Sequence, residues 1–269
     1  MKVLALVNDT TSTLMASVYS DPQVKIGCIF GTGCNAAYME ECSSIPKIKK
    51  CKADDTPVVI NTECGAFGSV HKVLPRNRFD EQIDRGSLYP GEQTYEKLVA
   101  GLYLGQLLRL VLLEFGSKGL IFKGYDTSRL KDPTTLDSKH LSVIEADDTD
   151  KLTIVRDLFC ARFSIDPEPH ECRIIKHLVE LIGTRAARLF VCTIAAICKK
   201  KKIDQCHVGV DGSAFDKNSK FQEKAAQALR EIFDRDPKMG EQFHLQVTEA
   251  GSGLGAALVA ALAMERDQI

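Results

Sequence analysis

Apolar segments that end in polar or glycine-rich tips recur along this chain and constrain its fold more than any other feature. Residues 3–7 run into Asn8, Asp9 and Thr10, and residues 26–30 run into the tip 31–35, which reads Gly-Thr-Gly-Cys-Asn. In open α/β sheets, ligands bind at the carboxyl ends of the strands. One tip offers a carboxylate, and the other offers small residues whose N–H groups can approach a phosphate closely. The two tips together are typical of a phosphoryl-transfer site.

The composition is that of an ordinary globular protein. The chain has 269 residues, of which 44% are apolar and 26% charged, and its 35 Lys and Arg balance 36 Asp and Glu. This neutral balance makes nucleic acid a poor partner. The ten cysteines contain no C-x-x-C pair and no histidine cluster, which argues against zinc. No signal peptide precedes the chain, so we expect a cytoplasmic protein with free thiols.

Residues 98–115 form the stretch that most resembles a membrane span. Gln106, Arg109 and Glu114 interrupt it, and charges at bilayer depth are costly. The stretch therefore predicts a core helix, and we expect no membrane span.

The hydrophobic pattern predicts a mixed sheet with helices on both faces. Strands are expected at 3–7, 26–30, 36–39, 58–61, 207–210 and 244–248, with the first three in an antiparallel meander. Helices are expected at 93–115, 150–163, 171–182, 184–200, 220–233 and 255–266. The polar segment 126–148 is interpreted as a surface excursion. This order predicts an α/β fold with a helical insertion over roughly residues 92–200.

A series of motifs, in one order along the chain, resembles the eukaryotic hexokinases. The motifs lie at 8–10, 26–40, 61–68, 86–97, 184–187, 208–213 and 251–258. Together they cover essentially the whole chain, whereas a lone Gly-Thr-Gly would mean little. The resemblance implies an actin-like ATPase (ribonuclease H-like) lobe with a mixed five-stranded sheet.

The resemblance also implies that residues 1–269 form a single large C-terminal lobe. In the family, a small lobe and an Asp-Leu-Gly-Gly-Thr phosphate motif precede the position of Asn8. Asp9 stands close to the start of the chain. We therefore expect that the small lobe, as a partner, is missing upstream.

The implied function is that of a glycolytic transferase: ATP-dependent phosphorylation of a hexose, with glucose as the expected substrate, at the 6-hydroxyl. Asp9 is the implied catalytic base. Mg²⁺ would be held by the phosphates of ATP and by water, with Asp9 in the outer shell and no direct protein ligand. A carboxylate of ordinary pKa, ~3.9, is a weak base, but positioning and charge neutralisation carry most of a loose phosphoryl transfer. On the residues alone, Asn8-Asp9-Thr10 is also typical of a helix N-cap or a turn.

The resemblance assigns a set of polar residues to the sugar. They are Asn8, Asp9, Gly33, Asn35, Glu63, Gln93 and Glu96. Carboxylates and amides suit the ring of hydroxyl groups on a pyranose. Gln93 and Glu96 are three apart and would share a helix face. Each of them alone is also typical of a solvated surface residue.

A second set is assigned to the nucleotide. It comprises Thr32, Gly33, Gly101, Thr184, Arg185, Arg188, Gly212, Ser213 and Ser252. Thr32 and Gly33 would cradle the transferring phosphate in a tight turn between strands. Thr184 is expected to start a helix, so that its hydroxyl and free N–H groups face the nucleotide, or to be a plain N-cap.

The chain departs from the family pattern at a few positions. Cys64 stands where many members have Trp, Gly183 replaces a usual Ser, and Ala250 and Leu254 replace an acidic and a basic residue. Cys34 lies inside the phosphate loop, so its oxidation or alkylation is expected to block the site.

Two alternatives remain beside the kinase. One is a sugar-sensing or scaffold protein that keeps the hexokinase shape without catalysis. The other is an actin-like chaperone ATPase, which the sugar-binding acids disfavour. For a hexokinase, this chain alone is expected to be weakly active or inactive, because half of the cleft and its exclusion of water are absent.

Overall fold

A computed structural model describes residues 3–48, 57–70, 72–233 and 242–267. Its internal contacts divide the chain into two compact units. Unit 1 comprises the described residues of Met1–Cys64, Val191–Asp216 and Ala226–Ile269, and unit 2 those of Gly65–Phe190 and Lys217–Ala225. Each unit is described by itself below.

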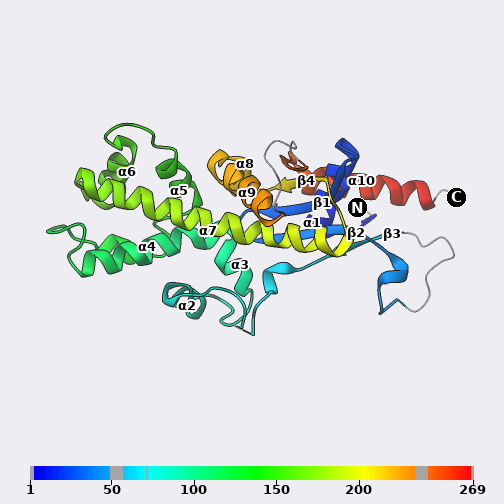
Figure 1. The fold of residues 1–269 in the computed structure, drawn as a ribbon, viewed down its shortest axis with the longest axis horizontal. Helices are drawn as coiled ribbons and strands as arrows, with labels where there is room; N and C mark the ends of the chain where they lie inside the picture. Colours follow the sequence, from blue (N-terminus) through cyan, green and yellow to red (C-terminus); the bar gives the residue numbers. More distant parts are fainter. Residues whose placement is uncertain (1–2, 49–56, 71, 234–241, 268–269) are drawn as a thin grey trace. The chain divides into compact units, whose positions relative to one another are not determined.

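Unit 1 is built on a five-stranded sheet in the order β3-β2-β1-β4-β5, of which Figure 1 labels β1 to β4. The strands are β1 (Val24–Phe30), β2 (Cys34–Glu41), β3 (Pro57–Asn61), β4 (Cys206–Asp211) and β5 (Phe243–Val247). β1, β2 and β3 pair antiparallel, whereas β1, β4 and β5 pair parallel. The predicted mixed five-stranded sheet is therefore confirmed.

Helix α1 (Asp9–Ser20) packs on one face of the sheet, and α10 (Gly251–Asp267) packs on α1. The helix approaches so closely that glycine is required: a Cβ atom at Gly27 of β1 would lie 2.6 Å from the Leu14 Cα. At the end of α1, the Ser17 and Thr248 hydroxyl groups hydrogen-bond at 2.7 Å in the interior. On the other face lies the last part of α7 (Pro169–Lys201), whose Cys198 hydrogen-bonds Cys206 of β4.

The contacts of α1 fix its direction against the sheet. Asp21, which follows the helix, pairs with His207 at the start of β4, and Ser17 lies against Gly209 in the middle of that strand. Thr13 lies one turn earlier, beside Gly251, which also adjoins Asp211 at the end of β4. α1 therefore runs antiparallel to β4, and its first turn lies toward the carboxyl ends of β1 and β4.

Unit 2 is helical. Its elements are α2 (Arg78–Arg85), α3 (Thr94–Val99), α4 (Gly101–Ser117), α5 (Ser138–Glu145), α6 (Thr153–Phe163) and the first part of α7, with short 3-10 turns η2 (Cys64–Ala66) at its border and η3 (Ser128–Lys131) within it. The rings of Phe122, Phe159 and Phe163 pack against one another in its core, tilted by 34° and 47°, at centroid distances of 5.7 and 5.2 Å. The remaining elements are η1 (Cys42–Ser44), α8 (Ser213–Asp216) and α9 (Ser219–Ile232).

The prediction of a strand at residues 3–7 is wrong. The segment has no regular structure, and Leu6 is 98% exposed. A strand is stabilised by hydrogen bonds to a neighbour, and this segment pairs with none of the described strands. The meander consists instead of β1, β2 and β3, while α1, which follows residue 8, was not predicted.

Three helical predictions also need correction. The helix predicted at 93–115 is two helices, because Ala100 adopts an extended backbone with ψ of 146° between α3 and α4. The two helices predicted at 171–182 and 184–200 are one, α7. Gly183 does not break it; a Cβ there would lie 3.3 Å from Lys224 Nζ, so its small size leaves room for the Lys224–Glu145 ion pair. Segment 126–148 is more than a surface excursion, since it contains α5 and the fully buried Leu130.

One described helix, α7, is long and apolar enough to cross a membrane by length and composition. It is not the stretch 98–115 that the sequence suggested. Since 56% of its most apolar window is buried within the protein, α7 has the properties of a core helix, which passes the same test.

Candidate active site at the carboxyl edge of the sheet

Several segments of unit 1 that are distant in sequence meet at one edge of the sheet. β1 and β4 are parallel, so Phe30 and Asp211 end at the same edge. β2 is antiparallel to β1 and begins at this edge, and β3 ends there. The turn 31–33, Asn35 and Asn61 therefore lie along one edge, which in open α/β sheets is the ligand-binding edge.

Two glycine turns pack against each other at this edge. The Gly31 N–H donates to the Gly33 carbonyl at 3.0 Å, which closes the turn between β1 and β2. Gly212, which follows β4, has φ of 134°, and a Cβ atom there would lie 2.3 Å from the Phe30 carbonyl oxygen. Only glycine fits both the conformation and the contact. The predicted glycine-rich turns after these strands are confirmed.

The start of α10 joins the same edge. The Ser252 N–H donates to Asp211 Oδ2 at 3.0 Å, and Ala250, immediately before the helix, has φ of 49°. A Cβ at Gly251 would lie 3.2 Å from Asp211 Oδ2 and 3.3 Å from Thr13 of α1. The first turns of α1 and α10 are thus brought to the end of β4; the helix after the glycine turn 251–253 was predicted, whereas α1 was not.

Asn8 and Asp9 open α1. The Asn8 Oδ1 accepts hydrogen bonds from the N–H groups of Thr10 at 2.9 Å and Thr11 at 3.2 Å, so Asn8 is an N-cap. Asp9 is exposed in the first turn, and its Oδ1 accepts from the Thr10 N–H at 2.6 Å. Asn8 caps the helix, so the alternative of an N-cap in this motif is confirmed. The cap leaves the Asp9 carboxylate exposed, and Asp9 can therefore still act on a ligand.

Asn61 connects two of the predicted sugar residues. Its Oδ1 accepts a hydrogen bond from Asn35 Nδ2 at 2.7 Å, and its Nδ2 donates to Glu63 Oε1 at 2.6 Å. The Thr62 hydroxyl donates to the Ala36 carbonyl at 2.8 Å and so fixes the end of β3 against β2. Asn61 lies in the 61–68 motif, but the sequence alone assigns it no role. The signal that could have found it is its position two residues before Glu63 at a strand end.

Glu63 occupies an unfavourable backbone conformation. Its φ is 49°, in the left-handed region, where a non-glycine residue costs of order 1–3 kcal/mol. Its side chain is exposed and bonded through Oε1 to Asn61. Strained residues of this kind cluster at functional sites.

Cys64, next to Glu63, has an altered acidity. Hydrogen bonds from the Cys34 thiol, and from the Thr62 and Thr193 hydroxyl groups, lower its pKa to about 7 against the opposing effect of burial. A thiol of this pKa is partly thiolate at neutral pH.

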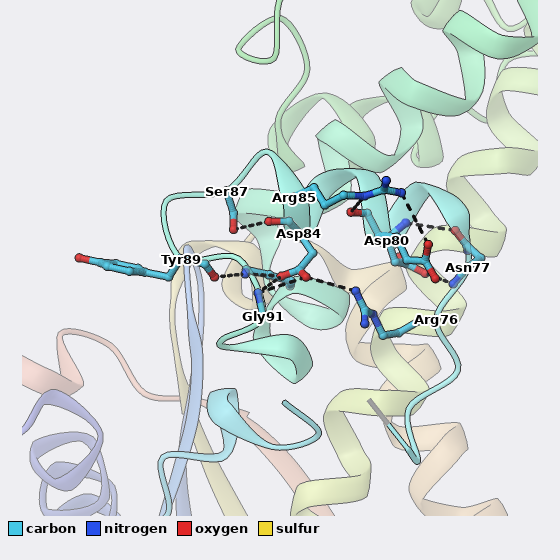
Figure 2. Close-up of polar contacts among 10 residues, drawn as sticks. Arg76, Asn77, Asp80, Asp84, Arg85, Ser87, Tyr89 and Gly91 are labelled. Atoms are coloured by element: carbon cyan, nitrogen blue, oxygen red, sulfur yellow. Dashed lines mark hydrogen bonds and ion pairs between the residues drawn. The ribbon is translucent and has the colours of Figure 1, made fainter. Parts of the chain in front are cut away.

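Unit 2 holds the other predicted sugar residues after a loop fixed by ion pairs. Figure 2 shows Asp84 between Arg76 and Gly91: its Oδ2 pairs with Arg76 at 3.3 Å, and its Oδ1 accepts the Gly91 N–H at 3.0 Å. Lys97 of α3 donates to Asp84 Oδ1 and to the Tyr89 carbonyl, both at 2.6 Å. These contacts anchor the loop that leads into α3.

Gln93 and Glu96 follow this loop. Gln93 has φ of 50° at the start of α3, and its Oε1 is buried with no hydrogen-bond partner among the described residues. A buried acceptor without a donor is rare in native proteins and calls for a ligand or water. Glu96 is half-buried in the first turn of α3.

The structure changes the interpretation of the predicted nucleotide residues in unit 2. Thr184 does not start a helix: it lies inside α7, and its hydroxyl donates to the Glu180 carbonyl at 2.7 Å. Arg185 forms a bidentate pair with buried Asp80 at 2.8 and 2.9 Å, which orients its side chain. Gly101 is the buried first residue of α4, and Arg188 is exposed on α7. Their roles toward a nucleotide stay predictions.

Among the residues that the structure describes, no group of three or more His, Cys, Asp or Glu side chains could hold a metal ion. The donor set at the sheet edge, an exposed carboxylate beside glycine turns and helix N-termini, suits a cation that arrives with phosphate groups.

The fold and the arrangement of this edge define a lobe of the actin-like type found in sugar kinases. A glucokinase of the ROK family from Streptomyces griseus, at a TM-score of 0.50 and 13% identity over 97% of this chain and 68% of that one, shares the fold alone. The hexokinase from Schistosoma mansoni complexed with glucose aligns at a TM-score of 0.87 with 36% identity, over 96% of this chain and 57% of that one.

Sequence comparison agrees. The profile described as "Hexokinase" matches residues 25–262, and a hexokinase from Emericella nidulans is 51% identical over 99% of this chain and 55% of its own length. The chain belongs to the hexokinase family. It spans about half the length of the curated relatives it matches.

Proposed function

We propose that this chain carries the catalytic base and most sugar ligands of an ATP-dependent hexose 6-phosphotransferase whose substrate is glucose. The observation that carries the proposal is the gathering of Asp9, the Asn35–Asn61–Glu63 network and two glycine turns along one edge of one sheet. Both the acid and the polar groups needed for a sugar are therefore held by the same unit.

The chemistry follows from these groups. Asp9 would accept the proton of the 6-hydroxyl as that oxygen attacks the γ-phosphorus, and positioning supplies most of the rate. Glu63 accepts hydrogen bonds from sugar hydroxyl groups, and Asn35 both donates and accepts, while Asn61 holds the two side chains in place.

The phosphate groups would meet the glycine turns. Gly33 and Gly212 have no side chain that would keep a phosphate from their backbone N–H groups, Thr32 adds a hydroxyl group, and Ser213 and Ser252 stand at the first turns of α8 and α10. Helix N-termini and exposed N–H groups favour anions. Mg²⁺, bound to the phosphates of ATP, would neutralise charge there, with Asp9 nearby as an outer-shell acceptor.

The glucose-bound state of the hexokinase from Schistosoma mansoni supports glucose as the sugar. In unit 2, the unpaired buried Oε1 of Gln93 supports a hydroxyl ligand for this residue. Glu96 is proposed as a further sugar acceptor on the same helix.

Transfer of phosphate requires more of the protein than binding of glucose does. Since the chain spans about half of its relatives, we propose that turnover requires the remaining half of a hexokinase. Residues 1–269 alone are expected to bind glucose and to transfer phosphate weakly or not at all, because water would reach the γ-phosphate. Phosphorylation at an ordinary enzymatic rate by this chain alone would contradict that expectation.

The test is a single-turnover assay with γ-labelled ATP, Mg²⁺ and glucose in a full-length hexokinase that carries this lobe, using Asp9→Asn as the variant. Labelled glucose 6-phosphate that falls at least ~100-fold in Asp9→Asn, as loss of a general base predicts, supports the kinase. Saturable glucose binding with no transfer, even in a full-length hexokinase carrying this lobe, favours the sugar-sensing alternative.

A further inference from the structure

Unit 1 holds a pair of cysteines that links the two segments of the candidate sugar site. Cys34 begins β2 directly before Asn35, and Cys64 follows Glu63 directly. β2 and β3 pair with Ala37 opposite Asn61, and the Thr62 N–H extends this ladder to the Ala36 carbonyl at 2.9 Å. Cys34, at the start of β2, and Cys64, which follows the end of β3, therefore lie at the same end of this strand pair.

The two thiols are in contact. The Cys34 thiol hydrogen-bonds the Cys64 sulfur, and the Thr62 and Thr193 hydroxyl groups complete the surroundings of that sulfur. The hydrogen bond holds the two sulfur atoms next to each other, so a disulfide requires only a short approach of the two residues. Cys34 is 5% exposed, whereas Cys64 is partly open to solvent. An oxidant can therefore reach Cys64 first.

We propose that Cys34 and Cys64 form a peroxide-sensitive dithiol that closes to a disulfide and lowers the affinity of this site for glucose. The effect on glucose rests on the proposed function, while the disulfide itself does not. The pair acts as a reversible modification site on the sugar-binding edge.

The chemistry balances in two steps. The Cys64 thiolate attacks hydrogen peroxide: an S–O bond forms, the O–O bond breaks, and the departing hydroxide takes up a proton to give water. The Cys34 sulfur then attacks the sulfenic sulfur of Cys64, an S–S bond forms, and the S–O bond breaks with loss of a second water. The two cysteines lose two electrons and peroxide gains them.

The lowered pKa of Cys64, about 7, supports its role as the attacking group, because about half of it is thiolate at pH 7. The lowering comes first from the Cys34 hydrogen bond. Replacing Cys34 by Ala should therefore move the pH midpoint of Cys64 alkylation upward, which a purely structural role for Cys34 would not do.

Closure would disturb the ligands on both sides. A hydrogen-bonded sulfur pair lies well beyond the ~2.05 Å length of an S–S bond, so the two segments must move together. Asn35 and Glu63 are the immediate neighbours of the two cysteines, and their link through Asn61 depends on bonds of 2.7 and 2.6 Å. We expect glucose affinity to fall at least ~10-fold and to recover after reduction.

The chain supplies a matched control. Cys198 and Cys206 are also hydrogen-bonded to each other, but both are buried, at 0% and 4% exposure, and in this pair the pKa of Cys198 lies well above its usual range, chiefly through its hydrogen bond to Cys206 and burial. If contact between two thiols were enough for oxidation, Cys198 and Cys206 would form a disulfide as readily as Cys34 and Cys64. The same hydrogen bond lowers the pKa of Cys206, so the two pairs differ mainly in access, and the burial of both thiols predicts that this pair stays reduced.

The experiment treats the wild-type chain, Cys64→Ser, Cys34→Ser and Cys198→Ser with hydrogen peroxide and maps disulfides by mass spectrometry without reduction. A Cys34–Cys64 linked peptide in wild type and Cys198→Ser, absent from the other two variants, supports the proposal. Glucose titration before oxidation, after oxidation and after dithiothreitol gives the second readout.

The contrary outcomes are distinct. Absence of the linked peptide, Cys64 halting at sulfenic acid, or a linked peptide with unchanged glucose affinity overturns the inference. If the reduced wild-type chain binds no glucose, the proposed function fails, and the disulfide is then judged by the mass data alone.

Discussion

The ion pair between Lys97 and Asp84 allows a quantitative test of how unit 2 holds the loop that leads into α3. The pair is 2.6 Å long, and the side chains are only 6% and 11% exposed. Lys97→Met keeps most of the apolar length of the side chain and removes its charged amine. Breaking a buried pair from one side costs about 3–5 kcal/mol, because the other charge is left uncompensated. Arg76 at 3.3 Å and the Gly91 N–H at 3.0 Å still face Asp84 (Figure 2). We therefore expect the lower end, about 3 kcal/mol.

The assay is urea unfolding followed by circular dichroism. The matched control is Lys118→Met, which removes an exposed i,i+4 pair with Glu114, whose side chains are 57% and 21% exposed. It should cost only about 0.3–0.5 kcal/mol. The double variant Asp84→Asn/Lys97→Met should lose less than Lys97→Met alone, since no buried charge is left unpaired. Equal losses for Lys97→Met and Lys118→Met would refute the reasoning.

The stability that Asp84 contributes should depend on pH, and its pKa gives the direction of that dependence. Burial by itself raises the pKa of Asp84, but the hydrogen bonds from Lys97 and Gly91 and the charges of Lys97 and Arg76 outweigh it and lower the pKa. A depressed carboxyl pKa contributes stability that is present above the unfolded value, ~3.9, and is lost as the pH falls below it. Lys97→Met should show a smaller acid-induced loss than the wild type.

Three further predictions follow from unit 1. Asn61→Ala should weaken glucose binding about 10-fold in calorimetry, as loss of two hydrogen bonds implies, while the thermal midpoint falls little; unaltered affinity would show that Asn61 positions neither neighbour. Glu63→Gly should remove the backbone strain at φ 49°, so the free energy of unfolding in urea should stay equal or rise by about 1 kcal/mol. The same variant should abolish glucose binding. A clear fall in the free energy of unfolding would contradict the presence of strain at Glu63. The hydrogen bonds from Lys200 and Lys201 lower the pKa of Glu40, so Glu40→Gln should lower the melting temperature by more at pH 7 than at pH 3. A larger fall in melting temperature at pH 3 than at pH 7 would contradict this prediction.

The five strands of the sheet could be predicted because each has an apolar run that ends in a glycine or polar segment. Periodicity failed where tertiary partners decide the structure. Residues 3–7 have the composition of a strand but no neighbouring strand, and residues 9–20 form a helix against the sheet in which Gly27 and Gly209 make room.

Only part of the candidate site could be predicted from the sequence. Glycine turns and exposed acids are visible in sequence because their residue types are specific to turns and to polar chemistry. The roles of Asn61 and Asp211 were not visible, since each acts by bonding a residue that only folding brings near. Thr184 was assigned to a helix start because Gly183 suggested a break, whereas a single glycine costs a helix only about 1 kcal/mol.

Glucose titration by calorimetry tests the central claim most directly, that acids distant in sequence meet at one sheet edge to bind one sugar. The chain as given is compared with Asp9→Ala, Glu63→Gln and the control Glu41→Gln, at the opposite, far end of β2. We predict saturable binding of one glucose, weakened at least ~10-fold by Glu63→Gln and measurably by Asp9→Ala, and unchanged by Glu41→Gln. Equal affinity in all four proteins, or no binding to the wild type, would contradict the account.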